Sequence, residues 1–148
     1  MEAILTSQAR SDSFAPSSKK RRWAGAILSG ISVLFLLFDS VVKLVEIQPV
    51  VDAMDKLGFP EQTARPIGLI LLACVVLYLV PRTAVLGAIL LTGYFGGAIV
   101  AHLRVLDPLF SHTLFPIYVA ALVWGGLYLR DPRVRTIAPW HRPERDDQ

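Results

Sequence analysis

The sequence predicts an all-α fold, an integral membrane bundle of four transmembrane helices. Its 148 residues are 53% hydrophobic and only 18% charged, with a mean hydropathy of +0.50. Soluble domains are usually about 25% charged, so lipid rather than water must solvate much of this surface. The Lys and Arg residues also avoid the middle of the chain, because five precede Trp23, five follow Leu129 and only five of the fifteen lie between them.

The apolar runs must form helices, because lipid offers no partners for unpaired backbone groups and the runs lack the period-two alternation of a membrane β-barrel. Pro49 ends the first helix, and Pro116 is tolerated in the first turn of the fourth. The second run, 66–80, spans only about 22 Å as a helix, so it must gain a turn before Arg65 or lie in thinned bilayer. The predicted helices cover about 23–47, 64–80, 83–104 and 113–129, within a transmembrane domain at 23–130.

The connections predict the topology. Pro81 interrupts the chain between the second and third helices and Thr83 can cap the third, so these helices form a tight antiparallel hairpin. Basic residues favour the cytoplasmic side, and the ten terminal cations together with Arg82 outnumber the three in the opposite loops. Both termini are therefore predicted to be cytoplasmic. The predicted flanks are a disordered basic tail at 1–22 and a cytoplasmic tail at 131–148 that is disordered from Ile137 onwards.

The first apolar stretch is too long for the core of a signal peptide, so we interpret it as a retained anchor of a multi-pass protein of the cell (inner) membrane. The single cysteine, Cys74, lies in an apolar run and excludes an intrachain disulfide. The pI is near 9.3, but no soluble segment carries a basic stripe interleaved with aromatic residues. Nucleic-acid binding is therefore not predicted.

The first outer loop is predicted to contain a short amphipathic helix. Pro49 starts it, Gly58 ends it, and four apolar residues between them recur at helical spacing. Such a helix lies on the membrane interface or caps the bundle, although a simple spacer with an apolar side fits the pattern equally well. The four apolar residues are Val50, Val51, Met54 and Leu57.

The third helix carries small residues at every fourth position. In lipid, such a ridge lets helix backbones approach closely and so promotes helix packing. We expect the ridge to pack inside the chain, with Gly125 and Gly126 as a counter-surface, although a second protomer, and hence a homo-oligomer, is left open. The ridge consists of Gly93, Gly97 and Ala101, with Gly96 beside them.

A polar face on the first helix is the best candidate for function. Asp39, Lys43 and Glu46 lie at i, i+4 and i+7, and Ser32 extends the stripe one heptad earlier. Ionisable residues inside a membrane usually pair with one another or line a cavity, and Asp39 is the natural partner of Lys43. An interfacial pair without a function is an equally weighted alternative, in which Lys43 extends to the headgroups.

Further polar residues are predicted to gather at the same outer end. His102 and Arg104 complete the candidate polar face, and His102 could carry a proton. Two histidines without a metal-site spacing do not predict a metal centre, and no catalytic motif is present, so neither metal ligands nor catalytic residues are predicted. The expected outer ring consists of Glu61, Arg65, His102, Arg104, Asp107 and His112.

Several short motifs, in order, resemble the DoxX-like family of small four-helix bacterial membrane proteins. The resemblance covers roughly Ile27 to Leu129, and the Lys43-Leu44 pair also fits it. The motifs are KLGFP at 56–60, GLILL at 68–72, VPRT at 80–83, LGA at 86–88, GYFGGA at 93–98 and AHLR at 101–104.

The resemblance implies little chemistry. The family's founding proteins are similar to the membrane subunit of a thiosulfate:quinone oxidoreductase, and other members are linked to redox or oxidative-stress complexes. This chain has only Cys74, without the second cysteine of a thiol relay. Two hypotheses remain: a non-catalytic membrane module that binds lipid, a small lipophile or a partner protein, which we favour, and a subunit of a quinone-linked oxidoreductase with a redox protein partner.

Overall fold

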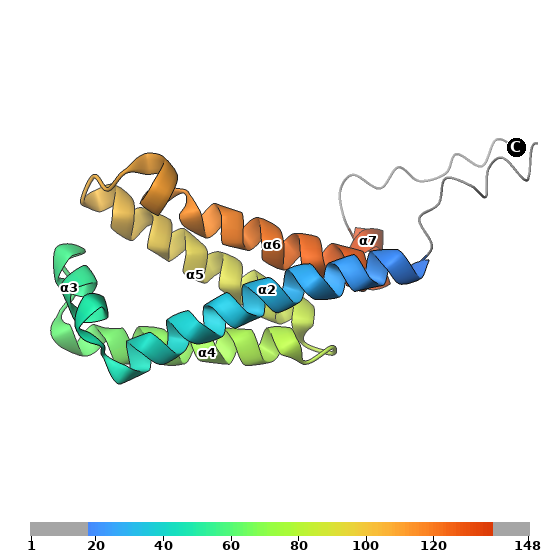
Figure 1. Cartoon of the computed structure of the whole chain (residues 1–148), viewed down its shortest axis with the longest axis horizontal. Coiled ribbons are helices and arrows are strands. Elements are labelled where there is room, and N and C mark those ends of the chain that lie inside the picture. The colour runs from blue at the N-terminus through green and yellow to red at the C-terminus, as the bar shows by residue number, and fades with distance from the viewer. Residues whose placement is uncertain (1–17, 138–148) are drawn as a thin grey trace, which may run out of the picture.

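The computed structural model describes residues 18–137, and every regular element within them is helical (Figure 1). The all-α prediction is thus confirmed for this part of the chain. The elements are α2 (Ser18–Val45), α3 (Gln48–Lys56), the 3-10 turn η1 (Glu61–Thr63), α4 (Ala64–Leu79), α5 (Ala84–Arg104), the π-helical turn η2 (Leu109–Thr113), α6 (Phe115–Arg130) and α7 (Pro132–Ile137).

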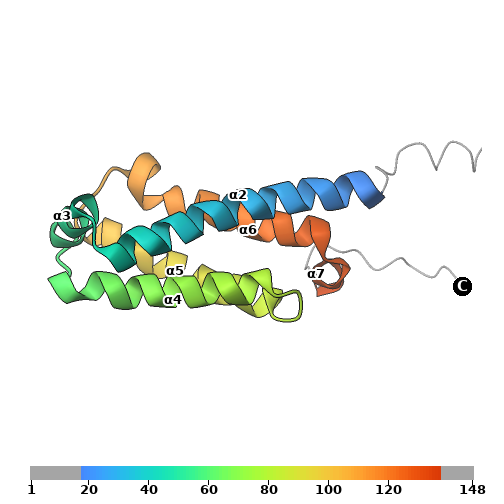
Figure 2. The same cartoon turned by 60° about the horizontal axis from the view of Figure 1, so that its bottom comes forward.

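The four long helices are antiparallel to their neighbours along the chain, and each packs against two of the others. Helix α2 packs against α4 and α6, and α5 packs against the same two helices, so α2 and α5 lie diagonally opposite each other. Helix α3 and η2 lie at one end of the bundle, which we call the α3 end. The turn at 80–83, the start of α2 and α7 lie at the other, the α7 end (Figures 1 and 2).

Three of these helices are long and apolar enough to cross a membrane: Lys19–Val45, Ala84–Arg104 and Leu109–Arg130. Helix α4 is apolar but has only 16 residues, which rise about 24 Å against a hydrocarbon core of about 30 Å. The turn η1 runs directly into α4 and supplies the added turn that the sequence required.

Both flanks are more helical than expected. Helix α2 begins at Ser18, because the Lys and Arg residues before Trp23 are good helix formers and continue the apolar helix outwards. Helix α7 occupies the start of the expected tail, where Asp131 Oδ1 accepts a hydrogen bond from the Arg133 N–H at 2.9 Å and Val134 is buried. The remaining tail predictions, at 1–17 and 138–148, lie outside the described residues.

Tyr78 lies at the centre of the core and is fully buried. Its hydroxyl donates to the Val123 carbonyl at 2.8 Å and lies 3.0 Å from Ser29 Oγ. This one side chain therefore joins α4 to both α2 and α6. A buried phenol needs such partners, since an unsatisfied polar group in an apolar core is costly.

The glycines that bring helices together are not those of the predicted ridge. A Cβ at Gly93, Gly96 or Gly97 would meet nothing within 4 Å among the described residues, so these glycines make no close helix contact there, and packing of the ridge against a second protomer stays a prediction. A Cβ at Gly25 would instead lie 2.8 Å from the Arg130 nitrogen, and one at Gly126 would overlap Ser29. Close helix approaches are therefore found between α2 and α6 and, at Gly87, between α5 and α4, whereas Gly93, Gly96 and Gly97 of α5 meet no described neighbour.

Candidate functional site

A cavity of about 460 Å³ opens between α2, α5 and α6 near the α3 end. Helix α3 and the loop after it cover one side of the cavity. It exists because α2 and α5 are diagonal and do not pack directly against each other at this level. Its wall is mainly apolar and aromatic, with Phe35, Phe59, Tyr94, Phe95 and Phe115 among the lining residues.

Three of the five residues predicted for the polar face line this cavity: Asp39, Lys43 and His102. Asp39 and Lys43 form an ion pair one turn apart on α2, with 27% and 12% of their side-chain surfaces exposed. The pair is therefore partly buried at the edge of the cavity. Gly68 of α4 makes this possible, because a Cβ there would come within 3.0 Å of Lys43 Cβ.

Glu46 does not line the cavity. It has a φ of 54°, so the chain leaves the helix there and its carboxylate turns away from the other two residues. Glu46 Oε2 lies 2.9 Å from Arg65 Nη2 and ties the end of α2 to α4. Ser32 is also outside the cavity, since its buried hydroxyl donates to the Ser29 carbonyl of its own helix at 3.0 Å.

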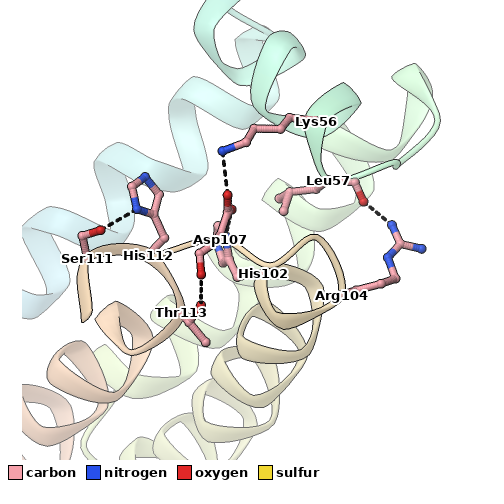
Figure 3. Close-up of polar contacts among 8 residues, drawn as sticks. All are labelled: Lys56, Leu57, His102, Arg104, Asp107, Ser111, His112 and Thr113. Atoms are coloured by element: carbon pink, nitrogen blue, oxygen red, sulfur yellow. Dashed lines mark hydrogen bonds and ion pairs between the residues drawn. The ribbon is translucent and has the colours of Figure 1, made fainter. Parts of the chain in front are cut away.

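His102 is held by a carboxylate that also binds a lysine (Figure 3). Asp107 Oδ2 lies 2.7 Å from His102 Nδ1, and Asp107 Oδ1 lies 2.6 Å from Lys56 Nζ. The Asp107 side chain is only 4% exposed, and its hydrogen bonds to Lys56 and then to His102 lower its pKa below the usual value. An ionised Asp107 accepts a hydrogen bond from the Nδ1–H of His102, which leaves Nε2 as the nitrogen that can bind a ligand.

Arg104 does not line the cavity, but it contacts the loop that does. Its guanidinium donates to the Leu57 carbonyl and lies 5.9 Å from the centre of the Phe59 ring (Figure 3). Gly58 between them has a φ of 70°, and a Cβ there would lie 2.9 Å from Arg104 Nη2. Arg104 thus positions the loop that places Leu57 and Phe59 against the cavity.

The rest of the expected ring contributes less to the cavity. His112 Nδ1 lies 2.8 Å from Ser111 Oγ, and its ring centre is 6.1 Å from that of His102. The Glu61 side chain lies outside the described part of the structure. Within residues 18–137, no group of three His, Cys, Asp or Glu side chains could hold a metal ion.

Sequence reasoning missed how the cavity is built. Tyr94 appeared only within a glycine-rich motif, and Phe59 only within the loop motif, yet both form its wall. Asp107 was placed in the outer ring without its partner, because five residues across a helix end is not a recognisable spacing. Besides the polar face, the ridge of small residues was a useful signal, since Gly97 and Ala101 line the cavity.

The fold and this apolar cavity define a helical membrane protein, since three of its helices have the length and composition of membrane spans. Residues 27–126 match the model of the DoxX-like family, so the chain belongs to that family. The match includes all the helices that line the cavity. No curated protein and no solved structure matches the chain.

Proposed function

We propose that this protein is a non-catalytic membrane module that holds a small lipophile in the cavity at the α3 end. The observation that carries the proposal is a mainly apolar and aromatic wall with only a few polar groups, here Asp39, Lys43 and His102. Sites for small apolar molecules usually have about 300–1,000 Å³ of volume, an apolar lining and a few polar groups that orient the ligand. The 460 Å³ cavity meets each of these criteria.

The test is purification in polymer nanodiscs, followed by mass spectrometry of the small molecules that remain bound. We expect one lipophilic compound at close to one molecule per chain. Gly97→Leu should displace it by filling the cavity, whereas Gly93→Leu, one turn earlier on the same helix, should retain it. Neither new side chain would clash at its Cβ. Equal retention by the two variants contradicts the proposal.

A second function, the membrane subunit of a quinone-linked oxidoreductase, is supported by the polar groups of the cavity. A quinone ring fits between aromatic side chains, and its carbonyl oxygens accept hydrogen bonds from cations such as Lys43 or from His102. Reduction of a quinone to a quinol takes two electrons and two protons, so the electrons would come from a separate redox protein partner. A bound quinone that a co-purified redox protein reduces, and whose reduction is lost in both His102→Ala and Lys43→Met variants, would establish this second function over the first.

We further propose that α4 crosses the membrane with the three longer helices and that both termini are cytoplasmic, in the cell (inner) membrane. Seven of the ten terminal cations belong to the described residues at the α7 end and support this orientation. Reporter fusions after residue 148 and within the loop at 105–108 test it. A cytoplasmic reporter should be active only at the first position and a periplasmic reporter only at the second.

A further inference from the structure

A second and larger concavity, of about 820 Å³, lies at the α7 end, far from the cavity proposed for the lipophile. It forms where the first turns of α2, the turn after α4 and the junction of α6 with α7 meet (Figure 2). We call it the basic groove. Its charged side chains are Lys19, Arg22, Arg82, Arg130 and Arg133, against the single carboxylate of Asp131.

The groove has a net positive charge, because five of its lining side chains are cationic and one is a carboxylate. The ion pairs that the structure describes between side chains lie at or near the α3 end, and none includes Lys19, Arg22 or Arg82. Like charges gathered in a concave surface repel one another and raise the local concentration of anions. An anion in the groove would therefore relieve this repulsion.

Arg130 is already positioned for such a ligand. Its guanidinium lies 4.7 Å from the centre of the Tyr78 ring, and Nη2 donates to the Tyr78 carbonyl at 3.2 Å. These contacts fix the planar group and leave other N–H donors available for phosphate oxygens. A fixed arginine loses less conformational entropy on binding than a free one.

The floor of the groove is apolar, which indicates more than a free anion. Leu127 and Ala84 are buried beneath it, and Trp23 stands at its rim with 65% of its surface exposed. Tryptophan at the end of a membrane helix usually lies at the level of the lipid headgroups. A free phosphate would leave this apolar wall in water, whereas the glycerol and acyl parts of a lipid would cover it.

We infer that the basic groove binds the phosphate of an anionic phospholipid, with the start of its acyl chains against Trp23. Basic pockets between membrane helices recognise lipid headgroups in this way. The inference needs only that the α7 end reaches the membrane surface. It holds on either side of the bilayer and is independent of the ligand at the α3 end.

The test is native mass spectrometry of the full-length, delipidated protein titrated with phosphatidylglycerol, with zwitterionic phosphatidylcholine as a second lipid. The groove variant is Arg22→Gln/Arg82→Gln. The matched control is Lys20→Gln/Arg21→Gln, which removes the same charge from neighbouring residues of α2 that do not line the groove. Thermal unfolding confirms that each variant is folded, and Lys19→Gln, at an exposed first-turn position, replaces the groove variant if that one is not.

We expect the wild type and the control to bind one phosphatidylglycerol tightly, and the groove variant to bind it at least about tenfold more weakly. Phosphatidylcholine should bind weakly to all three proteins. An equal loss in the groove variant and the control would overturn the inference, because binding would then follow net charge alone.

Two further experiments test whether free phosphate or the chain's own carboxylates occupy the groove instead. Inorganic phosphate should not raise the midpoint of thermal unfolding at the concentrations at which phosphatidylglycerol does, and an equal effect would assign the groove to free phosphate. The segment at 138–148 carries Glu144, Asp146 and Asp147 and is the other source of anions. If phosphatidylglycerol bound only after removal of that segment, the groove would belong to the chain's own carboxylates.

Discussion

Asp107 binds His102 and Lys56 with its two carboxylate oxygens, at 2.7 Å and 2.6 Å, and so joins the end of α5 to α3. The loop that contains Asp107 has to turn sharply to allow this, and Leu106 accordingly has a φ of 56°. The contact closes the α3 end over the cavity.

The first prediction concerns pH. The hydrogen bond from Lys56, and then that from His102, lowers the pKa of Asp107 in the folded protein below its unfolded value of 3.8. The resulting stabilisation is therefore fully present above that value and is lost as the pH falls through the lower folded pKa. Thermal unfolding from pH 7 to pH 3 should show this loss in the wild type. Asp107→Asn should be less stable at pH 7 and should show less of the loss, whereas Asp55→Asn on the exposed side of α3 should follow the wild type.

The second prediction concerns the ion pair on α2. Lys43→Ala leaves Asp39 charged and without its partner at the edge of an apolar cavity, which should cost about 1–3 kcal/mol of unfolding free energy. The double variant Asp39→Asn/Lys43→Met should recover most of that loss, because it removes both charges. Thermal unfolding in mild detergent measures both effects, and Lys20→Ala is the surface control. If the double variant is as unstable as Lys43→Ala, the unpaired charge of Asp39 is not the cause of the lost stability.

The third prediction concerns Tyr78. Tyr78→Phe keeps the ring but removes the hydroxyl, and with it the buried hydrogen bonds to the Val123 carbonyl and Ser29 Oγ. The expected cost is about 1–2 kcal/mol. Tyr118→Phe is the matched control, since Tyr118 is 49% exposed. Chemical unfolding of both variants in detergent provides the comparison, and similar stabilities would show that the hydrogen bonds across α2, α4 and α6 contribute little.

The sequence predicted the helices well because their signals are local. Pro49 and Gly58 bracket α3 closely, and Pro81 marks the turn between α4 and α5. The end of α2 was placed two residues too late, at Ile47, because Glu46 adopts a left-handed conformation, in which its carboxylate pairs with Arg65 of α4. A contact with a residue far along the chain leaves no local pattern.

The candidate site was predicted only in part. Asp39, Lys43 and His102 were expected at one end of the molecule, and they do share a cavity. The cavity itself could not be predicted, since it depends on the diagonal placement of α2 and α5. In lipid an apolar helix face can pack against another helix or against acyl chains, so the pattern of apolar residues does not say which faces meet.

The last prediction compares two glycines. Gly126 lies in a close contact between helices, whereas Gly93 belongs to a pattern of small residues without such a contact among the described residues. Gly126→Ala should destabilise the protein by about 1–3 kcal/mol, because the new methyl group would overlap Ser29 and force α6 away from α2. Gly93→Ala should be neutral or stabilising by up to about 1 kcal/mol, since alanine favours a helix and its Cβ meets no described atom. Thermal unfolding of the two variants in the same detergent gives the comparison. Destabilisation by Gly93→Ala that depends on protein concentration would mean that the open face of α5 packs against a second protomer.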